Sequence, residues 1–282
     1  DGEHLPRGTA VSMYRCVVKG IPIGQGFPVR LMGVINCSPE SFFHGSYVMP
    51  GSILKRADEM VSLGADIIDI GARSTAPRSP PISVATEAER LSAALAELDG
   101  TGIPVSVDTM HCAVLERALS HDIHAANDIS GFSDPAYSRF VADAGLPALL
   151  MASEKMPGDA TNFRETLANL SRIVTRCADA GVSSYILDPG IGLWTSSRST
   201  ALDWEICRHF EQCSQFGRPL LAAVSRKTFL GGPDGRPPEM RLPAALGITA
   251  MLLQKGADMI RTHDVGETAE VIRMASRMVG RV

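Results

Sequence analysis

The sequence lacks several patterns that mark common functional classes. Its six cysteines form no CxxC pair and its seven histidines form no HExxH or HxH motif, which argues against a zinc site and a disulfide framework. No apolar run reaches the roughly 18 residues that a membrane-spanning helix needs, and no secretory signal is visible. We therefore expect reduced core cysteines, a cytoplasmic location and no membrane partner.

An excess of positive charge is also missing. The 282 residues carry a formal net charge of −4, and the pI is near 6.0. We therefore expect no nucleic-acid partner, and any anionic ligand must bind a local cluster of positive side chains. His121 and His124 lie three positions apart, but no nearby cysteine or carboxylate completes a zinc site. No Ser/His/Asp or Cys/His constellation is visible either.

What the sequence does contain is a series of short apolar runs that end in polar or charged residues. In YILDPGIG, residues 185–192, three apolar residues lead into Asp188 and a Pro-Gly turn. One such run means little, because Asp often ends a strand as a turn residue. A repeated pattern of short continuous runs is typical of strands buried on both faces of a parallel sheet. The eight runs are LMGVIN, ADIIDIG, IPVSVD, IHAAND, LPALLM, YILD, PLLAAVSRK and ADMIRTHD.

Segments with a helical period separate these runs, for example SILKRADEMVSLG and NFRETLANLSRIVTRCADAG. Asp134 and Pro135 have the residue types of a helix N-cap and a first helical position. Strand and helix alternate eight times without a linker, which predicts an α/β fold, a (β/α)₈ TIM barrel of ~250 residues. An open doubly wound sheet is the alternative, although no GxGxxG follows the first run. We expect an N-terminal extension with a short β-hairpin over residues 1–27, which covers the barrel bottom, and a barrel over residues 28–282.

In a parallel barrel all strands end at one face, so the polar residues at the ends of the runs should meet around one mouth. Lys and Arg are not turn-capping residues, so independent turn caps do not explain the set. Carboxylates and amides suit a flat heterocycle with several N–H donors, and the cations suit a phosphate or diphosphate. The residues expected at the mouth are Asn36, Thr75, Asp108, Asn127, Asp188, Lys227, Arg261 and His263.

Seven motifs, in this order between residues 33 and 265, give the chain a resemblance to the dihydropteroate synthase family of pterin-binding barrels. The motifs are GVINCSPESFFHG, ADIIDIGARSTAP, SVDT, NDISG, ILDPGIG, SRKTFLG and RTHDV. The resemblance implies a transferase that condenses 6-hydroxymethyl-7,8-dihydropterin diphosphate with 4-aminobenzoate or a modified arylamine and releases diphosphate. This reaction belongs to folate or methanopterin-type biosynthesis. The resemblance also implies a Mg²⁺ cofactor and a homodimer.

The resemblance assigns roles to individual residues. Asp188 would accept hydrogen bonds from the amino-pyrimidine edge of the pterin, and Asp108 would stabilise the cation that forms when diphosphate leaves. Asn36 would bind both diphosphate and Mg²⁺, since this hard cation prefers oxygen ligands. The implied catalytic residues are Asp108, Lys227, Arg261 and His263; the implied substrate-binding residues are Asn36, Thr75, Asn127, Asp188, Ser38, Pro39, Phe42 and Thr228; the implied metal ligand is Asn36.

Several positions depart from the family pattern. The family usually has Glu or Gln where Arg73 stands, and Arg where Ala76 stands. After the sixth run, Leu193, Trp194 and Thr195 replace a Phe-Gly-Lys sequence, and after the fifth run Met151, Ala152 and Ser153 stand where a His-Met pair is usual.

These departures lie toward the second substrate, and Trp194 there is either a packing residue or a ligand shelf. We expect a preference for an arylamine with a longer, anionic para substituent, which Arg73 and Arg78 could reach. A pterin-dependent methyltransferase and a non-catalytic pterin-binding protein remain the alternatives.

Overall fold

Strands and helices alternate along the chain in the computed structural model, which describes residues 15–39, 47–74 and 80–281. The barrel strands are β3 (Arg30–Asn36), β4 (Ile67–Gly71), β5 (Val105–Asp108), β6 (Ala125–Asp128), β7 (Ala148–Met151), β8 (Tyr185–Asp188), β9 (Leu221–Ala222) and β10 (Met259–Thr262). The helices are α1 (Ile53–Ser62), α2 (Val84–Ala96), α3 (Cys112–Ala118), α4 (Pro135–Asp143), α5 (Phe163–Ala180), α6 (Thr200–Arg208), α7 (Leu242–Gln254) and α8 (Val265–Val279). Short 3₁₀ helices are η2 (Phe210–Phe216), η3 (Thr228–Gly231) and η4 (Pro238–Met240).

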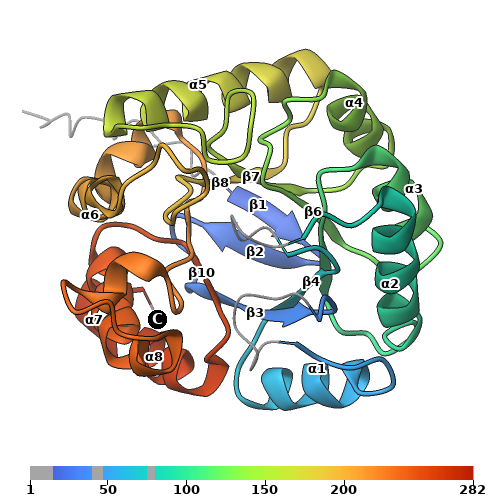
Figure 1. Cartoon of the computed structure of the whole chain (residues 1–282), viewed down its shortest axis with the longest axis horizontal. Coiled ribbons are helices and arrows are strands. Elements are labelled where there is room, and N and C mark those ends of the chain that lie inside the picture. The colour runs from blue at the N-terminus through green and yellow to red at the C-terminus, as the bar shows by residue number, and fades with distance from the viewer. Residues whose placement is uncertain (1–14, 40–46, 75–79, 282) are drawn as a thin grey trace, which may run out of the picture.

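The eight parallel strands form one sheet in the order β8-β7-β6-β5-β4-β3-β10-β9. A parallel bridge between Leu187 and Leu220 connects the two ends of this order, so the sheet closes into a barrel. Helices surround the strands on the outside (Figure 1). The predicted (β/α)₈ barrel is therefore confirmed, and the alternative of an open doubly wound sheet is not supported.

The starts of α2, α4 and α5 follow from local capping residues. Asp134 accepts the Ala136 N–H at 2.8 Å and Pro135 opens α4, as the sequence predicts. Asn162 accepts the Glu165 N–H in the same way at the start of α5. Such caps satisfy backbone donors that have no partner inside the helix. They fix where these helices begin, and so how far each of them lies from the end of the preceding strand.

An antiparallel hairpin precedes the barrel, formed by β1 (Arg15–Val18) and β2 (Ile21–Gly24). Three of its side chains, Cys16, Val18 and Ile23, are buried in one cluster with apolar residues from the barrel strands, among them Met32 and Met259. In Figure 1 the hairpin lies across the centre of the ring. The predicted hairpin is confirmed, while the division into two units at residue 27 stays a prediction.

The barrel presents alternate side chains to its interior and to the helices. On β4, for example, Ile68 and Ile70 belong to the larger core between strands and helices, whereas Ile67 belongs to the interior cluster. Asp69 lies between Ile68 and Ile70 and therefore also faces the interior. The lower part of the interior is thus apolar, and polar side chains begin one layer above it.

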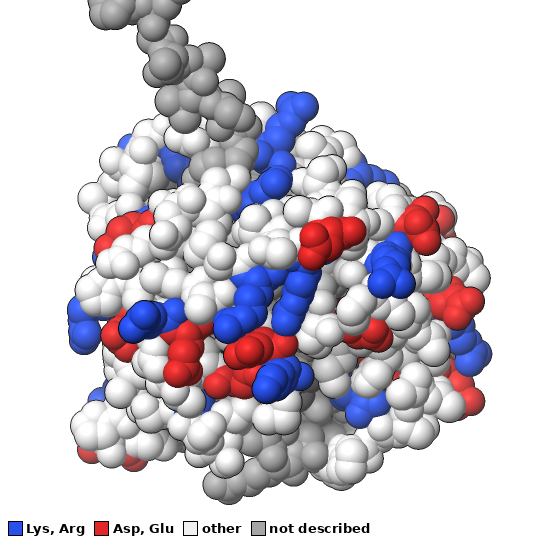
Figure 2. All heavy atoms as spheres, turned by 90° about the horizontal axis from the view of Figure 1, so that it is seen from above, with Lys and Arg blue, Asp and Glu red and all other residues white. Residues whose placement is uncertain are grey.

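The surface and the cysteines agree with the composition. Figure 2 shows a face on which Lys and Arg side chains intermingle with Asp and Glu. All six cysteines, which lie within the described residues, are free thiols, and all except the half-buried Cys112 are buried. Within the described part of the chain, no helix combines the length and the apolarity that a membrane crossing requires.

Candidate functional site

A hydrogen-bonded network of four polar side chains lies inside the barrel, below the mouth. Arg261 of β10 donates from Nε to Asp69 Oδ2 at 2.7 Å and from Nη2 to Asp108 Oδ2 at 2.8 Å. Asn127 of β6 donates from Nδ2 to the same Asp69 Oδ2 at 3.0 Å. The structure therefore brings together three of the residues expected at the mouth, Asp108, Asn127 and Arg261, through a fourth that was not expected.

Asp69 is the residue that the sequence analysis missed. It is 0% exposed and lies within β4, not at its end. The strand-end pattern could not single it out, because that pattern considers only the last residues of each run. The available signal was a carboxylate in the middle of the otherwise apolar ADIIDIG, since Asp is almost never fully buried unless it is paired.

The network sets the ionisation of its members. Burial raises the pKa of Asp108 to about 7. The positive charge of Arg261 acts in the opposite direction, but the negative charges of Asp69, Glu87 and Asp128 counter its effect. Burial disfavours the charge of Arg261, but the attraction of Asp69 and Asp108 outweighs it and raises the pKa of this guanidinium. Arg261 is thus a fixed positive charge between two carboxylates.

Asp188 and Lys227 form a second group of opposite charges at the mouth. Asp188 Oδ1 accepts the Gly190 N–H at 2.7 Å, and burial raises the pKa of the carboxyl group despite this bond and the nearby Lys227 charge. Burial lowers the pKa of Lys227 to about 8, an effect that Asp188 opposes. Each group thus favours the charged form of the other. The tight turn after β8 explains why a glycine stands two residues after Asp188, since Gly190 adopts a φ of 73°.

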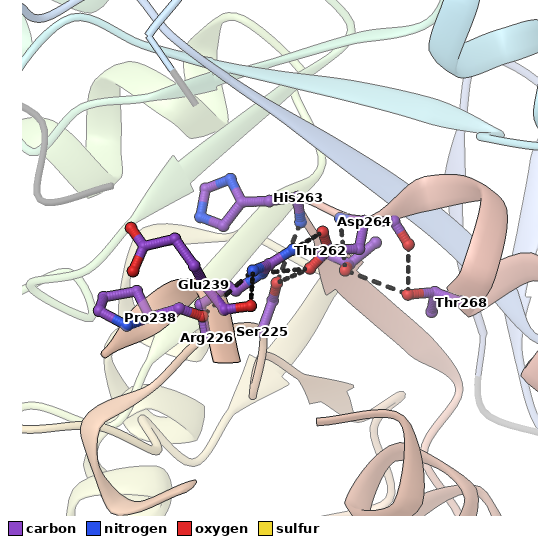
Figure 3. Close-up of polar contacts among 8 residues, drawn as sticks. All are labelled: Ser225, Arg226, Pro238, Glu239, Thr262, His263, Asp264 and Thr268. Atoms are coloured by element: carbon purple, nitrogen blue, oxygen red, sulfur yellow. Dashed lines mark hydrogen bonds and ion pairs between the residues drawn. The ribbon is translucent and has the colours of Figure 1, made fainter. Parts of the chain in front are cut away.

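His263 follows β10, and a dense set of polar contacts anchors the backbone around it (Figure 3). Its backbone N–H donates to Ser225 Oγ at 3.2 Å, while its ring extends away from the Asp264 side chain. Arg226 donates from Nε to Asp264 Oδ2 at 2.9 Å and from Nη1 to the Glu239 carbonyl at 3.1 Å. Arg226 therefore ties the segment after β9 to the segment after β10.

The charge state of His263 differs from the simple expectation of a cation at this position. Burial and the positive charge of Arg261 lower the pKa of His263 to about 3, against the opposing effect of Asp264. The imidazole is therefore neutral at pH 7 in the ligand-free protein. It can contact an anion through an N–H group but adds no positive charge of its own.

The remaining predicted residues that the structure describes lie at the end of β3 or in the segments after β3 and β9. Asn36 is half-buried at the end of β3, and its carbonyl accepts the Val48 N–H at 2.9 Å. Ser38 is buried, Pro39 is exposed, and Thr228 is exposed at the start of η3. Thr75 and Phe42 lie outside the described residues.

A magnesium site at Asn36 is compatible with this arrangement. Among the described residues, no group of three or more His, Cys, Asp and Glu could hold a metal ion. Mg²⁺ typically binds one or two protein oxygens, keeps several waters and takes the rest of its ligands from substrate phosphates. The amide oxygen of Asn36 is of the ligand type that such a site uses.

Trp194 connects two loops at the mouth. Its Nε1 donates to the Gly190 carbonyl at 3.0 Å, and Lys227 Nζ lies 4.6 Å from the centre of its ring. The ring also packs on Gly158, where a Cβ atom would lie only 2.3 Å from Trp194 Cγ. The buried Arg198 reinforces this contact by donating to both the Gly158 and the Gly190 carbonyls. These contacts favour the interpretation of Trp194 as a packing residue over that of a ligand shelf.

Arg73, which was considered as a receptor for a distal anion, is paired with a buried carboxylate in this structure. Its Nε donates to Glu87 Oε2 at 2.6 Å, and Glu87 also accepts from Thr109 Oγ1 at 2.6 Å and His111 Nδ1 at 3.0 Å. Burial opposes ionisation of Glu87, but these three contacts together lower its pKa. The Arg73 guanidinium is thus held by a buried carboxylate of α2, and Arg73 is a poor candidate for a receptor of a distal anion. Arg78 and Ala76 lie outside the described residues.

A Ser/His/Asp chain, which was not visible in the sequence, occurs at the opposite face of the barrel. Ser92 Oγ lies 2.7 Å from His121 Nε2, and His121 Nδ1 lies 2.7 Å from Asp99 Oδ2. Ser92 belongs to α2, Asp99 follows that helix, and Asp99 also accepts the Asp122 N–H at 2.9 Å. The chain of contacts therefore ties α2 to the segment before β6, away from the barrel mouth.

Known proteins that resemble the chain share one family description. The family model for "pterin binding enzyme" matches residues 32–263. The dihydropteroate synthase of Mycobacterium leprae is 33% identical over 265 residues, which cover 88% of this chain and 92% of the relative. The dihydropteroate synthase of Bacillus subtilis is 32% identical over 256 residues, 89% of each chain.

Solved structures give the same result. The Yersinia pestis dihydropteroate synthase, in complex with a sulfonamide drug, is 28% identical, covers 94% of this chain and 99% of its own, and superposes with a TM-score of 0.84. The Xanthomonas albilineans enzyme, solved with 4-aminobenzoic acid, is 28% identical, covers 96% of this chain and 100% of its own, and gives a TM-score of 0.82. A Coxiella burnetii dihydropteroate synthase in complex with pteroic acid is 27% identical. The match covers 94% of this chain and 98% of that enzyme, and its TM-score is also 0.82.

Proposed function

The chain belongs to the dihydropteroate synthase family of pterin-binding transferases, and from this premise we propose that it joins a pterin methyl diphosphate to an arylamine. The pterin substrate is 6-hydroxymethyl-7,8-dihydropterin diphosphate, and diphosphate is the second product. The observation that carries this proposal is the network of two carboxylates, an amide and a guanidinium inside the barrel, below the mouth. The relatives solved with pteroic acid and 4-aminobenzoic acid support the same substrates.

We assign the pterin to the carboxylate and amide groups. Asp188 has one oxygen on Gly190 and a second available for the amino group and ring N–H of the pterin. Asn127 and Asp108 offer further acceptors, and Lys227 donates to the ring acceptors. Thr228 lies close in sequence to Lys227 and would contact the edge of the substrate.

In the reaction, the bond between the exocyclic methylene carbon and the diphosphate oxygen breaks, and the electron pair leaves with the diphosphate. The nitrogen lone pair of the arylamine forms the new C–N bond, and the amine then loses a proton to solvent. Ionised Asp108 stabilises the positive charge that develops on the pterin. The arylamine is neutral at pH 7 and only has to be positioned, so the reaction requires no strong base.

The diphosphate would be bound by Arg261, by the neutral His263 through an N–H group, and by Asn36 and Thr75. Asn36 would also supply an oxygen to Mg²⁺, which neutralises charge on the departing diphosphate when it is bound. The protein groups act by orienting the leaving group at the mouth, above the fixed charge of Arg261. Ser38, Pro39 and Phe42, in the segment after β3, would cover the arylamine.

For the second substrate, both 4-aminobenzoate and a longer anionic arylamine fit the family. Ala76 and Thr195 are shorter than the cationic side chains that the family uses, and the extra space favours the longer amine. Because Arg73 is held by Glu87, Arg78 is the cation of this segment that could contact a distal anion.

We further propose a homodimer that forms through α7 and α8. Met251 is 55% exposed on α7, and Met274 and Met278 are 56% and 78% exposed on α8, which packs beside α7. An apolar face of this kind fits its own copy across a two-fold axis. Light scattering should report a dimer for the parent and a monomer for Met251→Glu, whereas Met49→Glu, at a 65% exposed site elsewhere, should stay dimeric. A monomeric parent would contradict this assignment.

Release of diphosphate separates the candidate functions. A synthase releases diphosphate from the pterin substrate only when an arylamine is present. A pterin-dependent methyltransferase would release none, and a non-catalytic pterin-binding protein would bind the pterin and return it unchanged. Phosphate detection after pyrophosphatase treatment measures this directly, and release that requires the amine is the expected result.

A further inference from the structure

Asp69 has no place in the scheme above, yet its surroundings differ from those of Asp258, a second buried carboxylate that is paired with an arginine. Asp258, 2% exposed, has both oxygens bonded, to Arg281 Nη2 at 2.7 Å and to the Leu220 N–H at 2.9 Å. Asp69 instead has two donors on Oδ2, whereas Oδ1 is buried without a hydrogen-bond partner among the described residues. A buried carboxylate oxygen without a hydrogen bond lowers the stability of the folded protein, so packing alone does not explain Asp69.

We propose that Asp69 is a positioning residue of the pterin site, which orients the Arg261 guanidinium and the Asn127 carboxamide for contact with the substrate. The proposal rests on the roles proposed above for these two residues. Asp69 is fully buried behind these two side chains and would not touch the substrate, so it would act only through them.

The effect on Asn127 follows from hydrogen-bond chemistry. An ionised carboxylate can only accept, so the Asn127 NH₂ group must face Asp69 and the amide oxygen must face away from it. That oxygen is then available as an acceptor for the N–H donors of the pterin. Without the Asp69 charge, the Asn127 amide can reverse, which places its NH₂ group against the N–H donors of the pterin and removes the acceptor.

The effect on Arg261 concerns its pairing with Asp108. An arginine and a carboxylate prefer a bidentate pair that uses two nitrogens of the guanidinium. Nε and Nη2 of Arg261 both lie 2.7 Å from Asp69 Oδ2, and Asp108 receives a single bond, from the same Nη2 at 2.8 Å. Asp69 therefore keeps Arg261 from neutralising Asp108 completely, and it fixes the plane of the guanidinium so that the remaining donors can reach the diphosphate.

The test compares Asp69→Asn with the parent by calorimetry, using 6-hydroxymethylpterin without diphosphate as the first probe. We expect the dissociation constant to rise about tenfold, the effect of one misplaced hydrogen bond. In an Asn127→Ala background the same substitution should change the constant less than about twofold, because its target is absent. A rise that stays tenfold in that background would show that Asp69 acts by general destabilisation, and an unchanged constant in the parent background would show that it has no positioning role.

The second probe is the pterin diphosphate, for which Asp69→Asn should lose more affinity than for the pterin alcohol, through Arg261. Asp258→Asn is the matched control, since it also neutralises a buried paired carboxylate but lies at the other end of β10, and it should leave both constants unchanged.

If Asp69→Asn does not fold, Asp69→Asn/Arg261→Met removes both charges and leaves no unpaired partner between them. Relative to Arg261→Met alone, it should still weaken the pterin alcohol about tenfold, and equal affinities would refute the proposal.

These outcomes differ from those that test the reaction itself. If the parent binds the pterin but releases no diphosphate, the proposed reaction fails, while the binding comparison still decides the role of Asp69. If the parent turns over and Asp69→Asn binds both probes like the parent, only the proposal about Asp69 fails. A parent that binds neither probe would overturn both.

Discussion

Replacing Asp188 by Asn tests the pterin-binding mode at one atom. Asp188 Oδ1 accepts the Gly190 N–H at 2.7 Å, and only an oxygen can keep this bond. In Asp188→Asn the amide oxygen must therefore stay on Gly190, and the NH₂ group takes the place of Oδ2. The variant then presents a donor to the donors of the pterin edge, in a pocket of nearly unchanged shape.

The expected loss combines two contributions. A charge-assisted hydrogen bond disappears and a donor faces a donor, which together cost about 2–4 kcal/mol of binding free energy. This corresponds to an increase in the dissociation constant of 6-hydroxymethylpterin by about 30-fold to about 900-fold, measured by calorimetry. Asp66→Asn is the control, since Asp66 pairs with Arg30 below the barrel and its loss should leave pterin affinity unchanged. An affinity of Asp188→Asn within about twofold of the parent would refute the assignment.

Three further predictions concern pH, metal and the second substrate. The pH profile of kcat/KM should be bell-shaped, because Asp108, with a pKa of about 7, must be ionised and Lys227, with a pKa of about 8, must be protonated. A flat profile across both values would contradict these roles. A chelator, or the variant Arg261→Ala, should reduce turnover far more than binding of the pterin alcohol, and full turnover in chelator would refute a role for Mg²⁺. An aminobenzene with a ribose phosphate should be used better than 4-aminobenzoate, by about 1–3 kcal/mol in kcat/KM, and a tenfold preference for the simple acid would show that Ala76 and Thr195 do not set specificity.

The barrel was predictable because its signals are local and repeat along the chain. Each buried strand is a short apolar run, and a capped helix such as α4, with Asp134 and Pro135, follows from residue types within one turn. The ends of the strands were also predictable, since a parallel barrel brings them to one face. For this reason Asp108, Asn127 and Arg261 were expected near one another, and the structure places them in one network.

The partners of these residues were not predictable in the same way. Asp69 and Arg261 are 192 positions apart, and only the closed barrel brings them within hydrogen-bonding distance. The pairing of Arg73 with Glu87 depends on how α2 packs against β4, which no run or period in the sequence encodes. The neutral state of His263 depends on burial beside Arg261, a property of the folded pocket and not of the residue type.

The most direct measurement of the central claim is a mass balance of the complete reaction. The protein is incubated with Mg²⁺, 6-hydroxymethyl-7,8-dihydropterin diphosphate and an arylamine, and the pterin, diphosphate and pterin–arylamine conjugate are quantified by mass spectrometry and phosphate analysis. The account predicts that one diphosphate and one conjugate appear for each pterin diphosphate consumed, and that both products are lost in Asp188→Asn. Recovery of unchanged pterin diphosphate with every arylamine supplied, from a protein that binds the pterin, would contradict it.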